Sequence, residues 1–369
     1  MNEVLLWLIR GLTVLLGSSY PAIAPEKGQA VDWGRDPSYA IYQDYRYTYD
    51  SYVYLFWDES TGAGPEDAGI TLTKGGWNHL EDSSGKEEGA EAQNPAEAAD
   101  GGWDPEKNGD LPGENRPAMA QLEDYDYLMK NFYSVHPSTT APRDLMKADE
   151  LVKMDLSLEK DPSVPQILIY HTHSQETYAD YGPENTDASV VGIGNTLARL
   201  LQEKGWNVIH DTSTYDIQGG TLDRSRAYNY ALEGISRILQ ENPSIQVVLD
   251  LHRDGVKEGL HLVSETEGRP TANIMFFQGM SRTPEGVIEY LPNPYLKENL
   301  AFTLQMQLDA AQNYPGFTRK IYMKGLRYNL HLRPCSALVE VGAQTNSGEE
   351  AHNAMGPLSE LLDRVLQGE

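Results

Sequence analysis

The chain has 369 residues, enough for one sizeable domain with accessory segments, and its 29 basic and 55 acidic residues leave a formal net charge of −26. Such a charge excludes a nucleic-acid reader, which needs a basic face against the phosphate backbone. The single cysteine, Cys335, excludes both a disulfide framework and a cysteine-based zinc site.

The first predicted element is an apolar run near the N-terminus, "VLLWLIRGLTVLLGSSYPAIA" at residues 4–24, which Arg10 interrupts. A membrane-spanning helix needs about 20 mostly apolar residues, so this run is short for a span and close to a signal-peptide core. We therefore expect residues 1–24 to be a signal-like or membrane-anchor segment; the alternative is an amphipathic first helix.

Three segments of different composition follow. Residues 25–57 are rich in aromatic side chains. Residues 58–115 hold 15 acidic residues and three lysines with much Gly and Pro, too little apolar surface to offset the entropy of ordering. We expect residues 58–117 to be a disordered acidic linker and residues 118–163 to be a transitional segment.

From residue 164 onwards, strand and helix patterns alternate. Short apolar runs predict strands at 166–170, 206–211, 245–252, 273–279 and 335–342. Apolar residues at helical spacing predict helices at 189–205, 222–240, 293–316 and 347–367. This alternation is typical of an α/β domain, here residues 164–369, with a mostly parallel twisted sheet and helices on both faces.

Polar residues follow three of these strands where each strand ends. Ligands of α/β sheets gather at the carboxyl ends of parallel strands, so we expect these residues to converge. The residues are His171, His173 and Glu176 after the first strand, Asp250, His252 and Arg253 at the end of the third, and Glu340 at the end of a late strand.

This residue set suits a catalytic zinc ion, which takes three protein ligands. His173 and Glu176 have the H-x-x-E spacing of two ligands from one turn, and His252 completes the set. Glu340 is the expected general base. His171 stays an alternative ligand, because residues i and i+2 of an extended segment share a face.

Two further residues have open roles. Asp250 is either a partner that orients a ligand histidine through its second ring nitrogen or a solvated charge at a strand end. Arg253 either binds a substrate carboxylate or an oxyanion, as a catalytic residue, or forms a structural salt bridge.

The motifs "YHTHSQE", "LDLHRDG" and "LVEVGAQTN", in this order within residues 164–368, resemble the stage II sporulation protein P family. The resemblance implies a zinc-dependent N-acetylmuramoyl-L-alanine amidase domain. Such an enzyme cleaves the amide between N-acetylmuramic acid and L-alanine of the peptidoglycan stem peptide, and family members are also described as cutting peptide cross-links. The family's histidine–glutamate motif falls on His171 or His173 with Glu176, its second histidine on His252 and its late glutamate on Glu340.

The resemblance also implies a setting: outside the cytoplasm, membrane-associated, at the sporulation septum during engulfment, with the stage II sporulation proteins D and M as partners. Two other classes remain compatible with the motifs. One is a different zinc hydrolase, such as a metallocarboxypeptidase or a deacylase. The other is a non-catalytic scaffold that binds the cell wall.

Overall fold

The computed structural model describes residues 117–368, apart from the side chains of Gln218 and Ser225. The predictions for residues 1–24, 25–57 and nearly all of 58–117 lie outside the described residues. Within the described part, no helix is both long and apolar enough to cross a bilayer.

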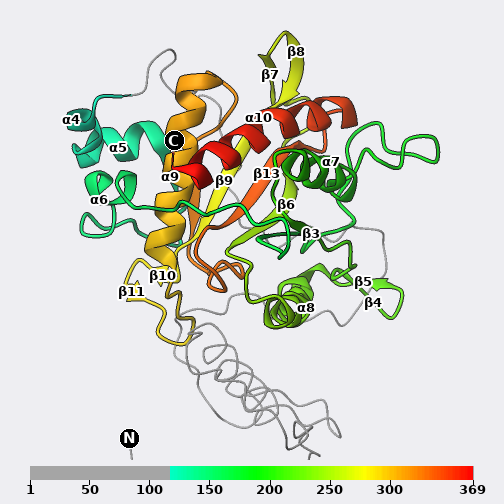
Figure 1. The fold of residues 1–369 in the computed structure, drawn as a ribbon, viewed down its shortest axis with the longest axis horizontal. Coiled ribbons are helices and arrows are strands. Elements are labelled where there is room, and N and C mark those ends of the chain that lie inside the picture. The colour runs from blue at the N-terminus through cyan, green and yellow to red at the C-terminus, as the bar shows by residue number, and fades with distance from the viewer. Residues whose placement is uncertain (1–116, 369) are drawn as a thin grey trace, which may run out of the picture. The chain divides into compact units, whose positions relative to one another are not determined.

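A seven-stranded sheet organises the described residues (Figure 1), in the order β1-β12-β9-β13-β6-β2-β3. Five of its six strand pairs are parallel, and only the pair of β9 and β13 is antiparallel. The strands are β1 (Tyr133–Val135), β2 (Ile167–Tyr170), β3 (Val208–His210), β6 (Val247–Asp254), β9 (Ile274–Gly279), β12 (Ile321–Lys324) and β13 (Ser336–Ala343).

Three two-stranded hairpins lie outside this sheet, and the sequence patterns did not predict them. They pair β4 (Ile217–Gln218) with β5 (Thr221–Leu222), β7 (Val263–Thr266) with β8 (Arg269–Ala272), and β10 (Arg282–Thr283) with β11 (Gly286–Val287).

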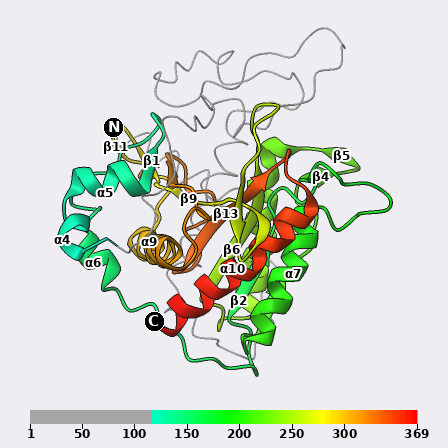
Figure 2. The same cartoon turned by 90° about the horizontal axis from the view of Figure 1, so that it is seen from above.

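Helices cover both faces of the sheet. Alternate residues of β2 point to opposite sides: Ile167 and Ile169 enter one core, whereas Leu168 packs with the helix α8 (Ala227–Glu241). The first face carries α7 (Val190–Glu203), α9 (Leu296–Asn313) and α10 (Gly348–Gln367). Figures 1 and 2 both show α10 between α9 and α7. The predicted α/β class, with a mostly parallel sheet and helices on both faces, is confirmed.

The prediction that residues 118–163 are a transitional segment before the α/β domain is wrong, because these residues belong to the domain. They form α4 (Met119–Leu122), α5 (Tyr125–Phe132), β1 and α6 (Ala148–Val152), and β1 pairs with β12 as an edge strand of the main sheet. Leu128 and Leu151 are fully buried in the main core. The sheet therefore begins before residue 164, which periodicity missed because β1 has only three residues.

Helix ends follow local signals that the sequence carries. Ser189 accepts a hydrogen bond from Gly192 N at the start of α7, and Gly205, with φ +94°, turns the chain after its end. The predicted helix at 222–240 begins later, because β5 and the short 3-10 helix η1 (Arg224–Arg226) come first.

Candidate metal centre

The three strands that carry the predicted site residues are adjacent and mutually parallel, in the order β13-β6-β2. Glu340 stands opposite His252 in the register of β13 and β6, and Tyr170 stands opposite Asp250 in that of β2 and β6. Their carboxyl ends therefore meet at one edge of the sheet, as the strand pattern predicts.

His173, Glu176 and His252 form a buried cluster at this edge. Their exposed fractions are 1%, 1% and 3%. The rings of His173 and His252 are 5.3 Å apart and nearly perpendicular, and His252 Nδ1 lies 3.5 Å from Glu176 Oε2. Both ring nitrogens of His173 are buried without a hydrogen-bond partner among the described residues. A buried imidazole with no partner is costly unless something else binds it.

The charges of the cluster follow from burial and from its neighbours. Burial lowers the pKa of His173 to about 4, so the ring is neutral and has a lone pair to offer at neutral pH. Burial works to raise the pKa of Glu176, but His252 outweighs it and holds that pKa at about 2. The cluster thus presents a neutral imidazole beside an ionised carboxylate, both suitable as metal ligands.

Asp250 orients His252 from the other side of the ring. Its Oδ1 lies 2.8 Å from His252 Nε2, and its two oxygens accept hydrogen bonds from Thr172 N and Thr172 Oγ1. Asp250 is fully buried, so it is not a solvated charge. With Nε2 facing Asp250, Nδ1 is the atom of His252 that faces Glu176 and remains for a metal ion.

His171 does not join this cluster, although alternation along a strand would place it on the face of His173. The strand ends at Tyr170, and the turn that follows breaks the two-residue period. His171 Nδ1 donates to Leu251 O (3.0 Å), and its Nε2 lies 2.8 Å from His210 Nε2. This pair packs against Gly194 of α7, where an added Cβ would come within 2.5 Å of His210. The geometry thus favours His173 as the ligand.

Glu340, the predicted general base, lies beside this cluster. It lies beside His252 in the sheet, and its Oε2 is buried without a hydrogen-bond partner among the described residues. Burial and the nearby charge of Asp254 raise the pKa of Glu340 to about 8, although His252 works in the opposite direction. A carboxyl group with a pKa near neutrality is suited to general acid–base work.

The guanidinium of Arg253 is engaged with the backbone. Its Nε donates to Thr177 O (3.0 Å) and its Nη1 to Asp254 O (3.2 Å), while its backbone N donates to Glu176 Oε2 (3.1 Å). It therefore fastens the Glu176 turn to β6, and its role toward a substrate stays a prediction. The cation that sequence reasoning missed is Arg224, whose Nη1 lies 4.0 Å from Glu176 Oε1.

Tyr228 was also missed. Its ring is stacked with that of His252 (interplanar angle 11°, centroids 6.5 Å apart) and meets His173 edge-on at 5.6 Å. Asn329 Nδ2 donates to Tyr228 O (2.8 Å) and ties the start of α8 to the 327–330 turn. No local pattern marks Arg224, which lies in η1, or Tyr228, in the first turn of α8, because both reach the centre through tertiary packing.

The donor set fits a zinc ion, with two imidazoles and one carboxylate from elements that the fold holds together. Within residues 117–368 no three His, Cys, Asp or Glu side chains are already arranged as a finished coordination shell. The unpartnered ring nitrogens of His173 are the observation that favours a metal ion here.

The fold and the cluster define an α/β protein with a buried histidine–carboxylate centre at the carboxyl ends of its parallel strands. A family model described as Stage II sporulation protein P (SpoIIP) matches residues 78–363, and the chain belongs to that family. The stage II sporulation protein P of Bacillus subtilis (strain 168) is 22% identical over 216 residues, which cover 54% of this chain and 50% of that protein. The chain thus spans about half the length of the curated relative it matches.

Among solved structures, the similar ones include two amidases at 15% identity. The CwlD amidase from Clostridioides difficile, solved in complex with the GerS lipoprotein, has a TM-score of 0.32 over 55% of this chain and 100% of that one. An N-acetylmuramoyl-L-alanine amidase from Clostridium difficile 630 has a TM-score of 0.34 over 56% and 96%. Structural similarity at these TM-scores says nothing about the site, so the site is described from the geometry of this chain alone.

Proposed function

We propose that the chain is a peptidoglycan hydrolase of sporulation, a zinc-dependent N-acetylmuramoyl-L-alanine amidase that cleaves the amide between N-acetylmuramic acid and L-alanine. The observation that carries the proposal is the buried set of His173, Glu176 and His252 with Glu340 beside it. Membership of the Stage II sporulation protein P family supports the wall substrate and the sporulation setting.

Each residue then has a defined task. His173, Glu176 and His252 would hold the ion, and Asp250 keeps the His252 ring in place through Nε2. A bound zinc ion supplies Lewis-acid chemistry, which polarises an amide carbonyl and acidifies water. Glu340 accepts the proton of the attacking water and returns it to the leaving amine of the stem peptide. The raised pKa of Glu340 favours its protonated form, which is the form that returns the proton to the leaving amine.

Arg224 is a candidate, beside Arg253, for holding a substrate carboxylate. It lies beside Glu176, whereas the guanidinium of Arg253 is used by Thr177 O and Asp254 O. A cation at the centre also suits a metallocarboxypeptidase, the second candidate function. Reaction products separate the two: free amino acids indicate a carboxypeptidase, and intact stem peptides indicate an amidase. Products from purified cross-linked peptides test the endopeptidase activity.

The cellular setting is proposed with the function. The enzyme acts outside the cytoplasm, associated with the membrane at the sporulation septum, and the stage II sporulation proteins D and M are its proposed partners. Family membership supports the sporulation part of this setting.

The test is zinc content and peptidoglycan digestion by the full chain, with Glu340→Gln and a matched control, Glu349→Gln, which changes an exposed carboxylate in the first turn of α10. We expect one zinc per chain in all three proteins. Wild type and control release whole stem peptides, and Glu340→Gln loses at least a hundredfold in kcat. Zinc-free folded wild type, or full activity of Glu340→Gln, would contradict the mechanism.

A further inference from the structure

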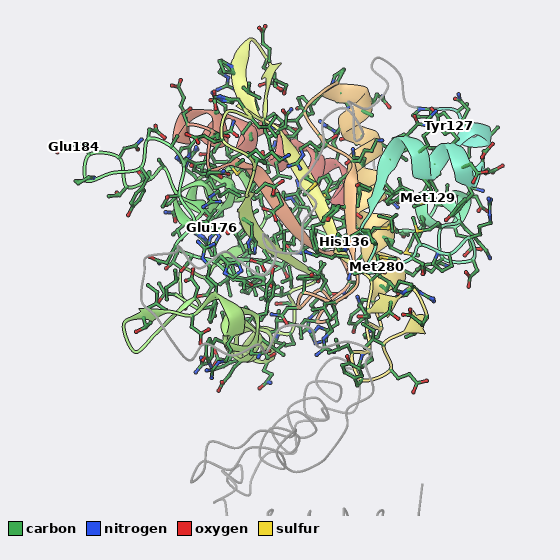
Figure 3. All side chains as sticks on the ribbon, turned by 180° about the vertical axis from the view of Figure 1, so that it is seen from behind. Tyr127, Met129, His136, Glu176, Glu184 and Met280 are labelled. Carbon is green, nitrogen blue, oxygen red and sulfur yellow. The ribbon has the colours of Figure 1, made fainter. Side chains whose placement is uncertain are left out.

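A row of aromatic rings leads from the candidate centre across one face of the sheet. Neighbouring ring centroids in it are 6.5, 5.4, 4.7, 5.6 and 6.2 Å apart, and the rings in order are His252, Tyr228, Tyr328, Phe277, Tyr322 and His136. We call these residues the aromatic row. It passes from β6 over β9 and β12 and ends after β1, the edge strand farthest from β3. Figure 3 labels its far end, His136, well away from Glu176.

The aromatic row is only partly covered by protein. Phe277 is 6% exposed and lies over a small core with Leu330 and Leu338. The other members of the row after His252 are partly exposed residues, namely Tyr228, Tyr328, Tyr322 and His136. A contiguous, partly exposed aromatic surface that starts at a buried polar centre is typical of a ligand site.

The chain holds Tyr328 in this row against its backbone preference. Tyr328 and Asn329 have φ of +49° and +58°, a left-handed conformation that a bulky side chain rarely adopts. The hydrogen bond of Asn329 to Tyr228 O, and that of Leu330 N to Arg327 O (2.9 Å), maintain the turn. Strained backbone of this kind persists where a side chain must be presented at a functional site.

Cations also lie beside the centre. Arg224 lies 4.0 Å from Glu176, and the backbone N of Arg253 contacts the same carboxylate. The aromatic row contains no carboxylate, ammonium or guanidinium group. The centre therefore has both cations and aromatic rings beside it, and a substrate bound there would meet both.

We propose that the aromatic row is a subsite for the glycan strand. This inference rests on the proposed function, in which the cleaved amide joins a sugar unit to a peptide. Sugar rings present flat C–H faces that pack on aromatic rings, whereas the carboxylates of the stem peptide need a cation.

Binding without turnover tests the subsite directly. The probe is a peptide-free glycan of six alternating N-acetylglucosamine and N-acetylmuramic acid units, titrated calorimetrically into the full chain in the presence of a chelator. We expect Tyr322→Ala to weaken binding at least tenfold. Tyr290→Ala, which removes a 60% exposed tyrosine outside the aromatic row, should leave it unchanged. If Tyr322→Ala has a much lower melting temperature than wild type, Tyr322→Leu is used in its place, because leucine keeps an apolar side chain over Phe277.

Absence of binding by wild type, or equal binding by wild type and a folded Tyr322 variant, overturns the proposal. A second measurement compares kcat/KM for a six-sugar substrate that carries stem peptides with kcat/KM for a single muramoyl peptide. We expect Tyr322→Leu to lower this ratio about tenfold through KM. An unchanged ratio in an active variant overturns the subsite alone. Glycan binding by a wild type that cleaves neither substrate overturns the proposed function and leaves the subsite standing.

Discussion

At the scale of single residues, two histidines that stand one residue apart have different environments. His171 is held by Leu251 O and His210, whereas both ring nitrogens of His173 lack a protein partner among the described residues. Protein hydrogen bonds use up the lone pair and the proton of a neutral imidazole, so only His173 is left to bind a ligand.

We predict that His173→Ala abolishes stoichiometric zinc binding and that His171→Ala keeps it. The second change leaves Leu251 O without its donor and should lower the free energy of unfolding by about 1–3 kcal/mol. Zinc per chain and thermal melting check both variants. Loss of zinc from a folded His171→Ala protein would show that His171 is a ligand and would contradict the assignment to His173 alone.

Cys335 offers a probe of the folded state. Burial raises the pKa of its thiol to about 12, and the side chain is 4% exposed. The thiol stays protonated and covered at pH 8, and the reactive thiolate forms only as the pH rises toward 12 or the chain unfolds. We expect alkylation at pH 8 to be slow in buffer and fast in concentrated urea, as followed by mass spectrometry. Fast alkylation of the native protein would contradict this burial.

At the scale of elements, the helix after β13 is fastened at its first turn. Ser347 and Glu350 form a capping box at the start of α10, and Asn346 accepts a hydrogen bond from Ala343 N and donates to Leu262 O. These contacts join α10 to the strand that carries Glu340, so the cap also supports the position of the proposed base.

We predict that Ser347→Ala lowers the free energy of unfolding by about 1 kcal/mol, because the amide of Glu350 loses its acceptor. Urea unfolding measures the change. Glu349→Gln in the same turn is the control, and it should cost only a few tenths of a kcal/mol through the helix dipole. Equal effects of the two substitutions would show that the cap contributes nothing beyond charge.

At the scale of the whole molecule, the segment before residue 164 completes the sheet and the core. β1 covers the edge of β12, and Phe132 and Leu151 are buried among residues of α9 and the sheet. Removal of this segment would expose a strand edge and an apolar surface together, which favours aggregation.

We predict that a chain of residues 117–369 unfolds cooperatively, whereas one of residues 164–369 is insoluble or melts at a much lower temperature. Circular dichroism melting of the two truncated proteins, beside the full chain, measures the difference. Equal melting temperatures would place residues 118–163 outside the folding unit.

The sequence by itself determined the α/β class and the positions of His173, Glu176, His252 and Glu340 at strand ends, because periodicity and strand ends depend on neighbours along the chain. Only the tertiary structure decided which face each histidine takes, because the turn after Tyr170 breaks the alternation that a strand would continue. It alone brought Arg224 and Tyr228 to the centre and paired β9 antiparallel to β13. These features depend on packing between residues far apart in the chain, which no local pattern records.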